Sequence, residues 1–312
     1  MPRLLASLAF AFALASSVQA FAAEFAVTKA DDGVTVNLDG KLFTRYLIAA
    51  GPKPYLWPIV SPAGKPITRA FPMEKVEGEK QDHPHHRSFW FTHGNVNDVD
   101  FWSESGKNGT IKHREFTKVE GGPAATISTV NDWLAPDGKK VLEDIRTVTF
   151  RTGEGGARII DFDITLKASD GPVTFGDTKE GSFGVRVPTT MDVLSKKGGK
   201  IVNSEGLADD AAWGKPARWV DYHGPVDGAV EGIAILNHPK SFRYPTTWHV
   251  RTYGLFAANP FGLRDFNKGG PEGTHKLAQG ESMTLRYRVI VHGGDEKAAK
   301  IAEAFEAYAK EP

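Results

Sequence analysis

Val141-Leu142-Glu143-Asp144-Ile145-Arg146-Thr147-Val148-Thr149-Phe150 and Ile159-Ile160-Asp161-Phe162-Asp163-Ile164-Thr165-Leu166 are the two segments that decide the fold class of this chain. Apolar and polar side chains alternate with a period of two in both segments, which is typical of a strand with one buried face and one solvated face. The segments belong to candidate strands at 140–152 and 158–168, and Pro136-Asp137-Gly138 marks a hairpin turn just before them. We therefore expect long antiparallel strands.

Shorter candidate strands recur between turn signals along the rest of the chain. Their approximate ranges are 25–29, 34–38, 41–48, 88–93, 109–119, 124–133, 173–175, 184–187, 218–222, 232–237, 252–258 and 282–292. Only 297–310 has the apolar stripe of a helix, opened by Gly294-Asp295 as a cap. The sequence therefore predicts an all-β fold in which residues 24–312 form a single large antiparallel β-sandwich of about fifteen or more strands, with a C-terminal helix.

The first 23 residues have the pattern of a secretory signal peptide. Arg3 is followed by an apolar run over 4–15 and then by small residues that suit signal peptidase. This run is too short to span a bilayer comfortably, so we expect an exported, periplasmic or secreted protein without a membrane span. The chain has no cysteine, which excludes disulfides, thiolate nucleophiles and Cys-ligated metals. With 38 basic and 38 acidic residues, the charge balance offers no reason to expect a nucleic-acid partner.

Histidines gather just before and within the candidate strand 88–93. His83, His85 and His86 lie in a Pro-broken approach to the strand, and His93 lies at its end. Imidazole suits proton transfer or metal ligation near neutral pH, so His85, His86 and His93 are candidate acid-base residues. His83, His85 and His93 are candidate ligands for a divalent metal, although we expect no cofactor. A polar surface loop is the alternative. Neighbouring candidates for substrate binding are Arg87, Trp90, Asn97, Asp100 and Trp102.

A Gly-bounded turn at 176–186 places further charged groups together. Glu180 is a candidate general acid or base, because burial and the charge of Lys179 or Arg186 would set the pKa of its carboxyl group. Lys179 and Arg186 are candidates for substrate binding. The alternative is a charged hairpin tip exposed to solvent.

A third stretch, 244–262, combines aromatic, cationic and amide side chains before and after an apolar strand. Trp248, Arg251 and Asn259 offer a flat apolar face and fixed hydrogen-bond donors, with which a site binds a sugar ring or another polyol, and His249 is a second candidate imidazole. A place in the core is the alternative for Trp248. The stretch 218–223 has a similar composition, but a solvated sheet rim explains it nearly as well.

Several of these strings together resemble a known family. They are His83-Pro84-His85-His86-Arg87-Ser88-Phe89-Trp90-Phe91-Thr92-His93-Gly94, Lys179-Glu180-Gly181, Ala217-Arg218-Trp219-Val220-Asp221-Tyr222, and Thr247-Trp248-His249-Val250-Arg251 with Gly254-Leu255-Phe256-Ala257-Ala258-Asn259-Pro260-Phe261-Gly262. The set resembles an exported bacterial domain-of-unknown-function family formerly labelled "methane oxygenase PmoA", with Ser88 where the commoner form has Gly. The resemblance implies a supersandwich similar to galactose mutarotase. The oxygenase label conflicts with the absence of several apolar spans.

These observations lead to one expected function and two rivals. We expect an exported carbohydrate-active enzyme, a hydrolase, lyase or epimerase, in which an imidazole and Glu180 exchange protons with a sugar or polyol. The rivals are a non-catalytic glycan-binding module and a metal-dependent oxygenase. A narrow pocket that brings His and Glu together would favour catalysis, whereas exposed aromatic side chains on a flat face would favour binding. The oligomeric state stays open.

Overall fold

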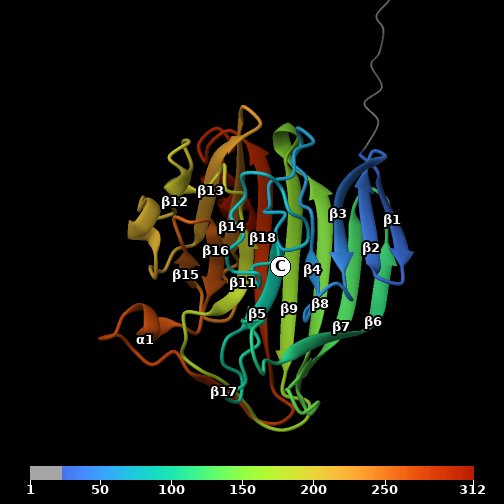
Figure 1. Cartoon of the computed structure of the whole chain (residues 1–312), viewed down its shortest axis with the longest axis vertical. Helices are drawn as coiled ribbons and strands as arrows, with labels where there is room; N and C mark the ends of the chain where they lie inside the picture. Colours follow the sequence, from blue (N-terminus) through green and yellow to red (C-terminus); the bar gives the residue numbers. More distant parts are fainter. Residues whose placement is uncertain (1–22) are drawn as a thin grey trace, which may run out of the picture.

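A computed structural model describes residues 23–312 of the chain. The predicted signal peptide at 1–23 therefore lies outside the described residues except for Ala23. Three antiparallel sheets make up the fold, two of eight strands and one of two strands (Figure 1). This arrangement confirms the predicted all-β sandwich.

The strand order places segments from distant parts of the sequence side by side. The first sheet runs β1 (Phe25–Ala30), β2 (Gly33–Leu38), β3 (Lys41–Leu47), β4 (Tyr55–Leu56), β5 (Phe89–His93), β11 (Gly181–Arg186), β16 (Leu255–Asn259), β15 (Thr247–Val250). The second runs β12 (Lys200–Asn203), β13 (Trp219–Val226), β14 (Ala229–Asn237), β18 (Ser282–Gly293), β9 (Arg158–Lys167), β8 (Lys140–Thr152), β7 (Ala125–Leu134), β6 (Thr110–Glu120). The third pairs β10 (Val173–Phe175) with β17 (His275–Leu277).

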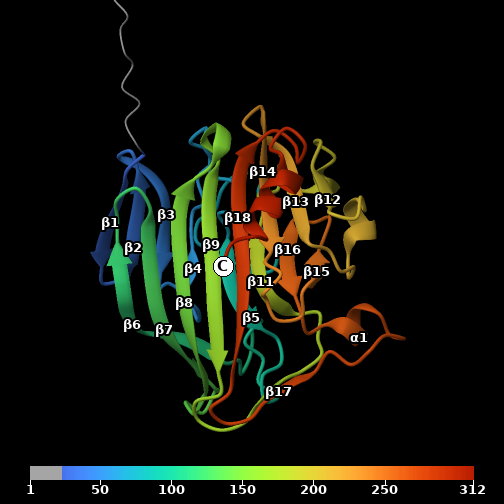
Figure 2. The ribbon, with the colours of Figure 1, turned by 180° about the vertical axis from the view of Figure 1, so that it is seen from behind.

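Helical segments are short. The α-helices are α1 (Leu263–Phe266) and α2 (Ile301–Tyr308), and the 3-10 turns are η1 (Glu154–Gly156), η2 (Val193–Ser195) and η3 (Asp209–Ala212). The predicted C-terminal helix is confirmed but begins at Ile301 rather than near Lys297, because residues 296–300 form turns. Its buried side chains pack on the outer face of the second sheet, where Figure 2 shows the red coil over β13, β14 and β18. No helix within residues 23–312 has the length and hydropathy needed to span a membrane.

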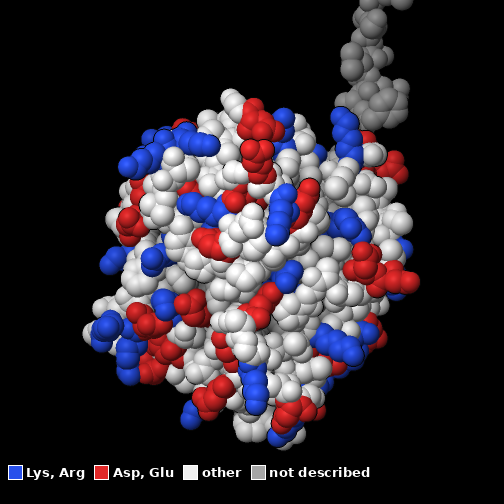
Figure 3. All heavy atoms as spheres, in the orientation of Figure 1, with Lys and Arg blue, Asp and Glu red and all other residues white. Residues whose placement is uncertain are grey.

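The two large sheets bury a common aromatic core. Phe89 and Phe183 from the first sheet contact Phe162 from the second, with ring centroids 5.8 and 4.9 Å apart respectively. These contacts place β5 and β11 directly over β9. On the face drawn in Figure 3, basic and acidic side chains are interspersed, in agreement with the balanced composition.

One buried polar network departs from a simple alternation of apolar and polar residues. On β8, Asp144 and Arg146 point into the sandwich in the same row as Leu142 and Val148, and both are buried. The carboxylate of Asp144 accepts hydrogen bonds from Asn131 and from the indole of Trp133, and it pairs with Arg146 at 2.8 Å. The inward face of this strand therefore carries a paired charge that period-two patterning would place in solvent.

Candidate active site

The strand order joins the three stretches that the sequence marks as chemically interesting. β5 lies between β4 and β11, β11 pairs with β16, and β16 pairs with β15. Gly184 on β11 stands opposite Trp90 on β5, and a Cβ atom at this glycine would come within 2.6 Å of the Trp90 ring. The missing side chain thus lets the indole lie across β11. The order of these strands brings three segments together at one place. They are residues 83–86, which we call the histidine loop, the Glu180 turn and the segment around His249.

These segments enclose a cavity of about 400 Å³, which we call the histidine cavity. Its lining residues are His83, His85, His86, Trp102, Ser103, Lys179, Glu180, His249, Arg251 and Tyr253. The predicted acid-base candidates His85, His86, Glu180 and His249 therefore share one cavity. Its volume falls in the range of small-molecule sites.

Burial keeps the imidazoles of His85 and His249 neutral. Burial, with a smaller effect from the charge of Lys53, lowers the pKa of His85 to about 4. Burial, followed by the charge of Arg251, lowers the pKa of His249 to about 3. Both rings are neutral near pH 7 and offer one hydrogen-bond donor and one acceptor each.

His86 is neutral and has a defined tautomer. Burial lowers its pKa well below the usual value, and the neighbouring His85 and Arg186 add to this effect. Arg186 places Nη1 2.9 Å from His86 Nδ1, and because a guanidinium can only donate, His86 Nδ1 accepts this hydrogen bond. The proton of the neutral ring is then on Nε2.

Two buried polar atoms of the cavity wall lack a partner within residues 23–312. They are His249 Nδ1 and Trp102 Nε1, whose side chains are 3% and 1% exposed respectively. A hydrogen bond with the backbone of Lys179 holds the His249 ring. A buried polar atom without a partner costs about 1–3 kcal/mol, so these two atoms are ready to bind polar groups of a ligand.

Two residues that do not line the histidine cavity hold the Glu180 turn in place by hydrogen bonds to its backbone. Asn259 donates from Nδ2 to the carbonyl of Thr178 at 2.8 Å, and Asp265 accepts the backbone N–H of Lys179 at 2.7 Å. Lys179 Nζ lies 3.0 Å from Glu180 Oε1, and this hydrogen bond raises the pKa of Lys179. Asn259, a predicted substrate-binding residue, thus positions the turn that carries Glu180.

A second layer of charges supports the histidine loop. Asp82 accepts hydrogen bonds from Arg69 and Arg186, and although burial opposes ionisation, these two cations hold the pKa of Asp82 below its usual value. The His83 ring is stacked on His86 and on Tyr253, with centroids 4.8 and 5.2 Å apart. Sequence reasoning assigned no role to Asp82, which directly precedes the histidines, or to Tyr253, which lies within the stretch 244–262.

Other predicted residues do not line the histidine cavity. His93 is buried, with Nε2 2.8 Å from the carbonyl of Gly176, and burial lowers its pKa to about 4. Trp248 lies in the core, where its indole donates to the carbonyl of Ala217 at 3.0 Å. Trp90 is buried behind His86, with ring centroids 5.4 Å apart.

Three further candidates are engaged in local structure. Arg87 forms a bidentate pair with Glu104, whose carboxylate also binds Lys53. Asn97 bonds the backbone of Pro172 and Thr174, and Asp100 accepts the backbone N–H groups of Trp102 and Ser103. None of these three side chains lines the histidine cavity, and Asn97 lines a separate, larger cleft.

The predicted histidine ligands do not form a metal-binding group. Within residues 23–312, Asp221, His223 and Glu296 are the one group of three ligand side chains with suitable spacing. The sequence marked Asp221 and His223 only as a possible solvated rim, yet both are buried. Glu296 and the neighbouring His292 carried no signal in the sequence.

A larger cleft of about 920 Å³ lies on the other side of the 176–180 turn. Its central carboxylate, Asp177, accepts backbone N–H groups of Arg264, Asp265 and Gly273. No histidine lines this cleft, and Asp177 is already engaged as a backbone cap. The histidine cavity therefore offers the better chemistry despite its smaller volume.

Solved structures similar in shape to this chain share little sequence with it. A GalM/aldose epimerase homologue from C. elegans is 10% identical, with 88% of this chain and 99% of that chain covered and a TM-score of 0.34. A galactose mutarotase related enzyme from Lactobacillus acidophilus is 12% identical, with 86% and 97% covered and a TM-score of 0.32. A glycoside hydrolase family 97 enzyme from Pseudoalteromonas sp. strain K8, in complex with acarbose, is 10% identical, with 86% of this chain but 34% of that chain covered and a TM-score of 0.33.

The comparison with curated proteins found no match. One family model matches residues 33–306, which include both large sheets apart from β1, together with the histidine cavity. Its description does not carry the oxygenase label that the resemblance suggested. From this match, the chain belongs to the family of unknown function DUF6807.

Proposed function

We propose that this protein is an exported carbohydrate-active enzyme whose histidine cavity binds a sugar or related polyol. Glu180 is the group that transfers a proton, and His85 and His249 hold substrate hydroxyl groups. The observation that carries the proposal is the buried, unpartnered Nδ1 of His249 in the same cavity as the carboxylate of Glu180.

The roles of the two residue types follow from their surroundings. The imidazoles of His249 and His85, with pKa values of about 3 and 4, are uncharged at neutral pH, so they are weak bases. A neutral imidazole can nevertheless accept a hydrogen bond from a hydroxyl group and donate one to a neighbouring hydroxyl. Glu180 faces the cavity with about a third of its side chain exposed and is thus accessible to substrate.

The remaining wall supplies an aromatic face and the Arg251 guanidinium. Tyr253 offers aromatic surface for the C–H face of a sugar ring. The Arg251 guanidinium lies against the rings of Trp213 and Tyr253, 5.7 and 5.6 Å from their centroids. It has no carboxylate within ion-pair distance among residues 23–312, so it can bind a pair of hydroxyls or a carboxylate of the substrate.

Hydrolysis, elimination and epimerisation all fit this arrangement. In each reaction a carboxyl group exchanges a proton with an oxygen or carbon of the sugar. The product formed from a given substrate distinguishes the three reactions.

The decisive experiment incubates purified protein with a panel of neutral sugars, uronic acids and their glycosides and identifies products by mass spectrometry. Deuterium incorporation from D₂O would report proton exchange at carbon. We expect turnover of at least one panel member that is lost in Glu180→Gln. The matched control is Glu272→Gln in the larger cleft, which should retain turnover.

Two outcomes would contradict the proposal. Loss of turnover in Glu272→Gln but not in Glu180→Gln would move the active site to the larger cleft. Binding of a glycan with unchanged affinity by both variants, without any product, would instead support a glycan-binding module. Adding a chelator to the same reactions tests the rival metal-dependent chemistry, because the proposed mechanism predicts no loss of rate.

A further inference from the structure

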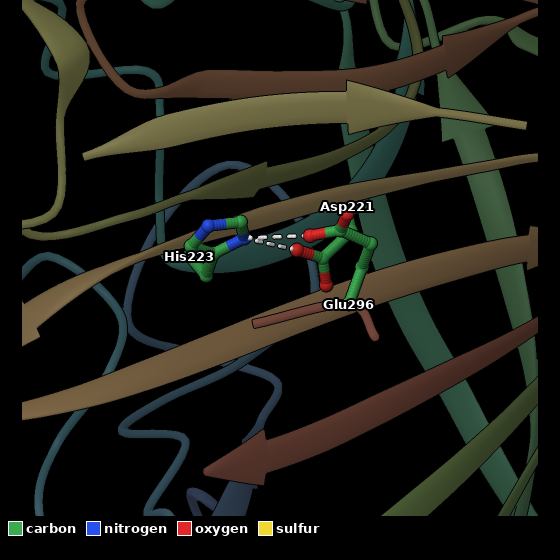
Figure 4. Close-up of side chains that lie close together, drawn as sticks. All are labelled: Asp221, His223 and Glu296. Atoms are coloured by element: carbon green, nitrogen blue, oxygen red, sulfur yellow. Dashed lines mark hydrogen bonds and ion pairs between the residues drawn. The ribbon is translucent and has the colours of Figure 1, made fainter. Parts of the chain in front are cut away.

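A second cluster of histidines and carboxylates lies on the outer face of the second sheet, remote in the fold from the histidine cavity. Asp221 and His223 on β13 and Glu296 after β18 each offer one ligand atom, and these three atoms lie within 4.8 Å of one another. Figure 4 shows the His223 ring turned toward both carboxylates. We call these three residues the outer cluster.

Strand alternation and the chain that follows β18 build this cluster. Asp221 and His223 are two residues apart on β13, on the face that also carries Trp219 and packs against α2. β18 ends at Gly293, and residues 296–300 form turns that bring Glu296 to the sheet. Asp295 Oδ1 shapes this segment by accepting the backbone N–H of Ala298 at 2.8 Å.

The outer cluster concentrates carboxylates where solvent is largely excluded. Asp221 is fully buried, with Oδ1 2.6 Å from His223 Nδ1 and Oδ2 2.7 Å from His292 Nε2. Glu296 Oε2 lies 3.8 Å from the same His223 nitrogen. Two carboxylates thus face one imidazole nitrogen, and a compact cation between them would offset their charge better than a single shared proton.

A buried carboxyl group, Glu231, lies beside the outer cluster. Glu231 and His292 both line a cavity of about 350 Å³ beside the outer cluster. Glu231 is 2% exposed, and its Oε2 has no hydrogen-bond partner within residues 23–312. Lys65, a nearby cation, is paired with Asp227 at 3.0 Å.

We propose that the outer cluster binds a divalent transition-metal ion, with zinc as the best match. One imidazole nitrogen and two carboxylate oxygens are donors that zinc accepts in three-ligand sites, with water in the fourth position. Binding displaces the proton between His223 Nδ1 and Asp221 Oδ1, and that proton goes to solvent. His292 then holds the free oxygen of Asp221 and orients it, as supporting histidine-carboxylate pairs do around metal ions.

The ion would fasten the segment after β18 to the sheet. β13 and the 296–300 turns are joined at the outer cluster by side chains alone, and α2 follows directly. A metal bridge here would add a cross-link in a chain that has no cysteine for a disulfide.

The test uses the tag-free mature chain, stripped with chelator and titrated with Zn²⁺ by calorimetry. We expect one equivalent to bind and the melting temperature to rise. Glu296→Gln should weaken binding by about ten-fold or more while the protein still folds, because Glu296 is partly exposed. The matched control on the same C-terminal segment is Glu303→Gln, an exposed position, which should bind zinc like the parent protein.

A double variant, His83→Ala/His85→Ala, separates this site from the histidine loop. It should keep the zinc stoichiometry, and Co²⁺ substituted into it should give the same visible absorption spectrum as in the parent chain. Zinc lost in this variant but kept in Glu296→Gln would place the ion at the histidine loop and overturn the proposal. Absence of zinc binding by the stripped parent chain would overturn it as well, leaving an ion pair between His223 and the two carboxylates.

Discussion

The histidine cavity and the outer cluster contain the same residue type in opposite electrostatic surroundings. His249 is buried beside Arg251, and its pKa falls to about 3. His223 is also buried, which disfavours its charged form, but the hydrogen bond and charge of Asp221 more than offset this effect and raise its pKa. Burial alone therefore makes an imidazole neutral, and one bonded carboxylate reverses the result.

The histidine cavity and the outer cluster also differ in which polar atoms lack a hydrogen-bond partner. In the histidine cavity, polar atoms of His249 and Trp102 have no partner within the described residues, so a ligand can supply one. In the outer cluster, both oxygens of Asp221 are already bonded to imidazoles, and a cation would enter by replacing a proton. The first arrangement suits a neutral polar substrate and the second suits a metal ion.

The largest expected effect tests the role of Glu180. Glu180→Gln should lower turnover by about 10²-fold or more, because an amide cannot transfer a proton, while the melting temperature stays within a few degrees. The double variant Glu180→Gln/His249→Asn should lose less than the two single losses combined, since residues that act as a unit are not additive. Steady-state kinetics and thermal unfolding measure both. Unchanged turnover in Glu180→Gln would remove this residue from the mechanism.

The next largest effect is on the free energy of unfolding, whose dependence on pH should differ between His249 and His223. The folded-state pKa of His249 is about 3, below the ordinary value of 6.5, so between these values the unfolded chain binds more protons and stability falls as the pH falls. For His223, with a raised pKa, the contribution is present below the unfolded value and is lost as the pH rises through the raised folded value. A difference of one unit between the pKa values of the folded and unfolded chain corresponds to about 1.4 kcal/mol in the free energy of unfolding.

Urea unfolding of His249→Asn and His223→Gln at several pH values checks these signs. His249→Asn should flatten the loss of stability between pH 6 and 4, and His223→Gln should flatten the loss above about pH 6.5. The control is the parent chain, measured under the same conditions at each pH. Equal acid slopes for the parent chain and His249→Asn would contradict the assigned surroundings of His249.

A smaller effect distinguishes two buried tryptophans. Trp248 donates its indole N–H to Ala217 in the core, so Trp248→Phe should cost about 1–3 kcal/mol of stability and leave KM unchanged. Trp102 faces the histidine cavity with its N–H unpartnered, so Trp102→Phe should raise KM by about ten-fold or less, with little loss of stability. Chemical denaturation and steady-state kinetics of the two variants measure these effects. A raised KM in Trp248→Phe and a loss of stability in Trp102→Phe would contradict the roles assigned here.

The smallest expected effect concerns reductant and export. Because the chain has no cysteine, its melting temperature should be the same with and without a thiol reductant. The same holds for the variants of the histidine cavity and of the outer cluster.

Intact-mass analysis of the periplasmic or secreted fraction should show a chain that begins near residue 21–24, after removal of the signal peptide. A cytosolic protein that keeps residues 1–20 would contradict the predicted export.

Local sequence determined most of the strands and the C-terminal helix, but it did not predict the short strands β4, β12, β15 and β17. Period-two alternation predicted β8 and β9, and turn signals bounded shorter strands such as β2, because both signals depend on residues close together in the chain. The stripe of Ile301, Phe305 and Tyr308 likewise predicted α2 and its buried face. These patterns also sufficed to mark the histidine loop and the Glu180 turn as candidate parts of a site.

Only the tertiary structure decided which candidate residues meet. His85, Glu180 and His249 share a cavity because β5, β11, β16 and β15 are neighbours, although about 70–95 residues separate them in sequence. The same folding turned His93 and Trp248 into the core and brought Glu296 to His223. The orientation and burial of a side chain depend on strand register and on partners from distant segments, and a shift of one residue would exchange the two faces of a strand. Sequence patterns therefore identified the chemical groups, and strand pairing assigned them to the histidine cavity, the core or the outer cluster.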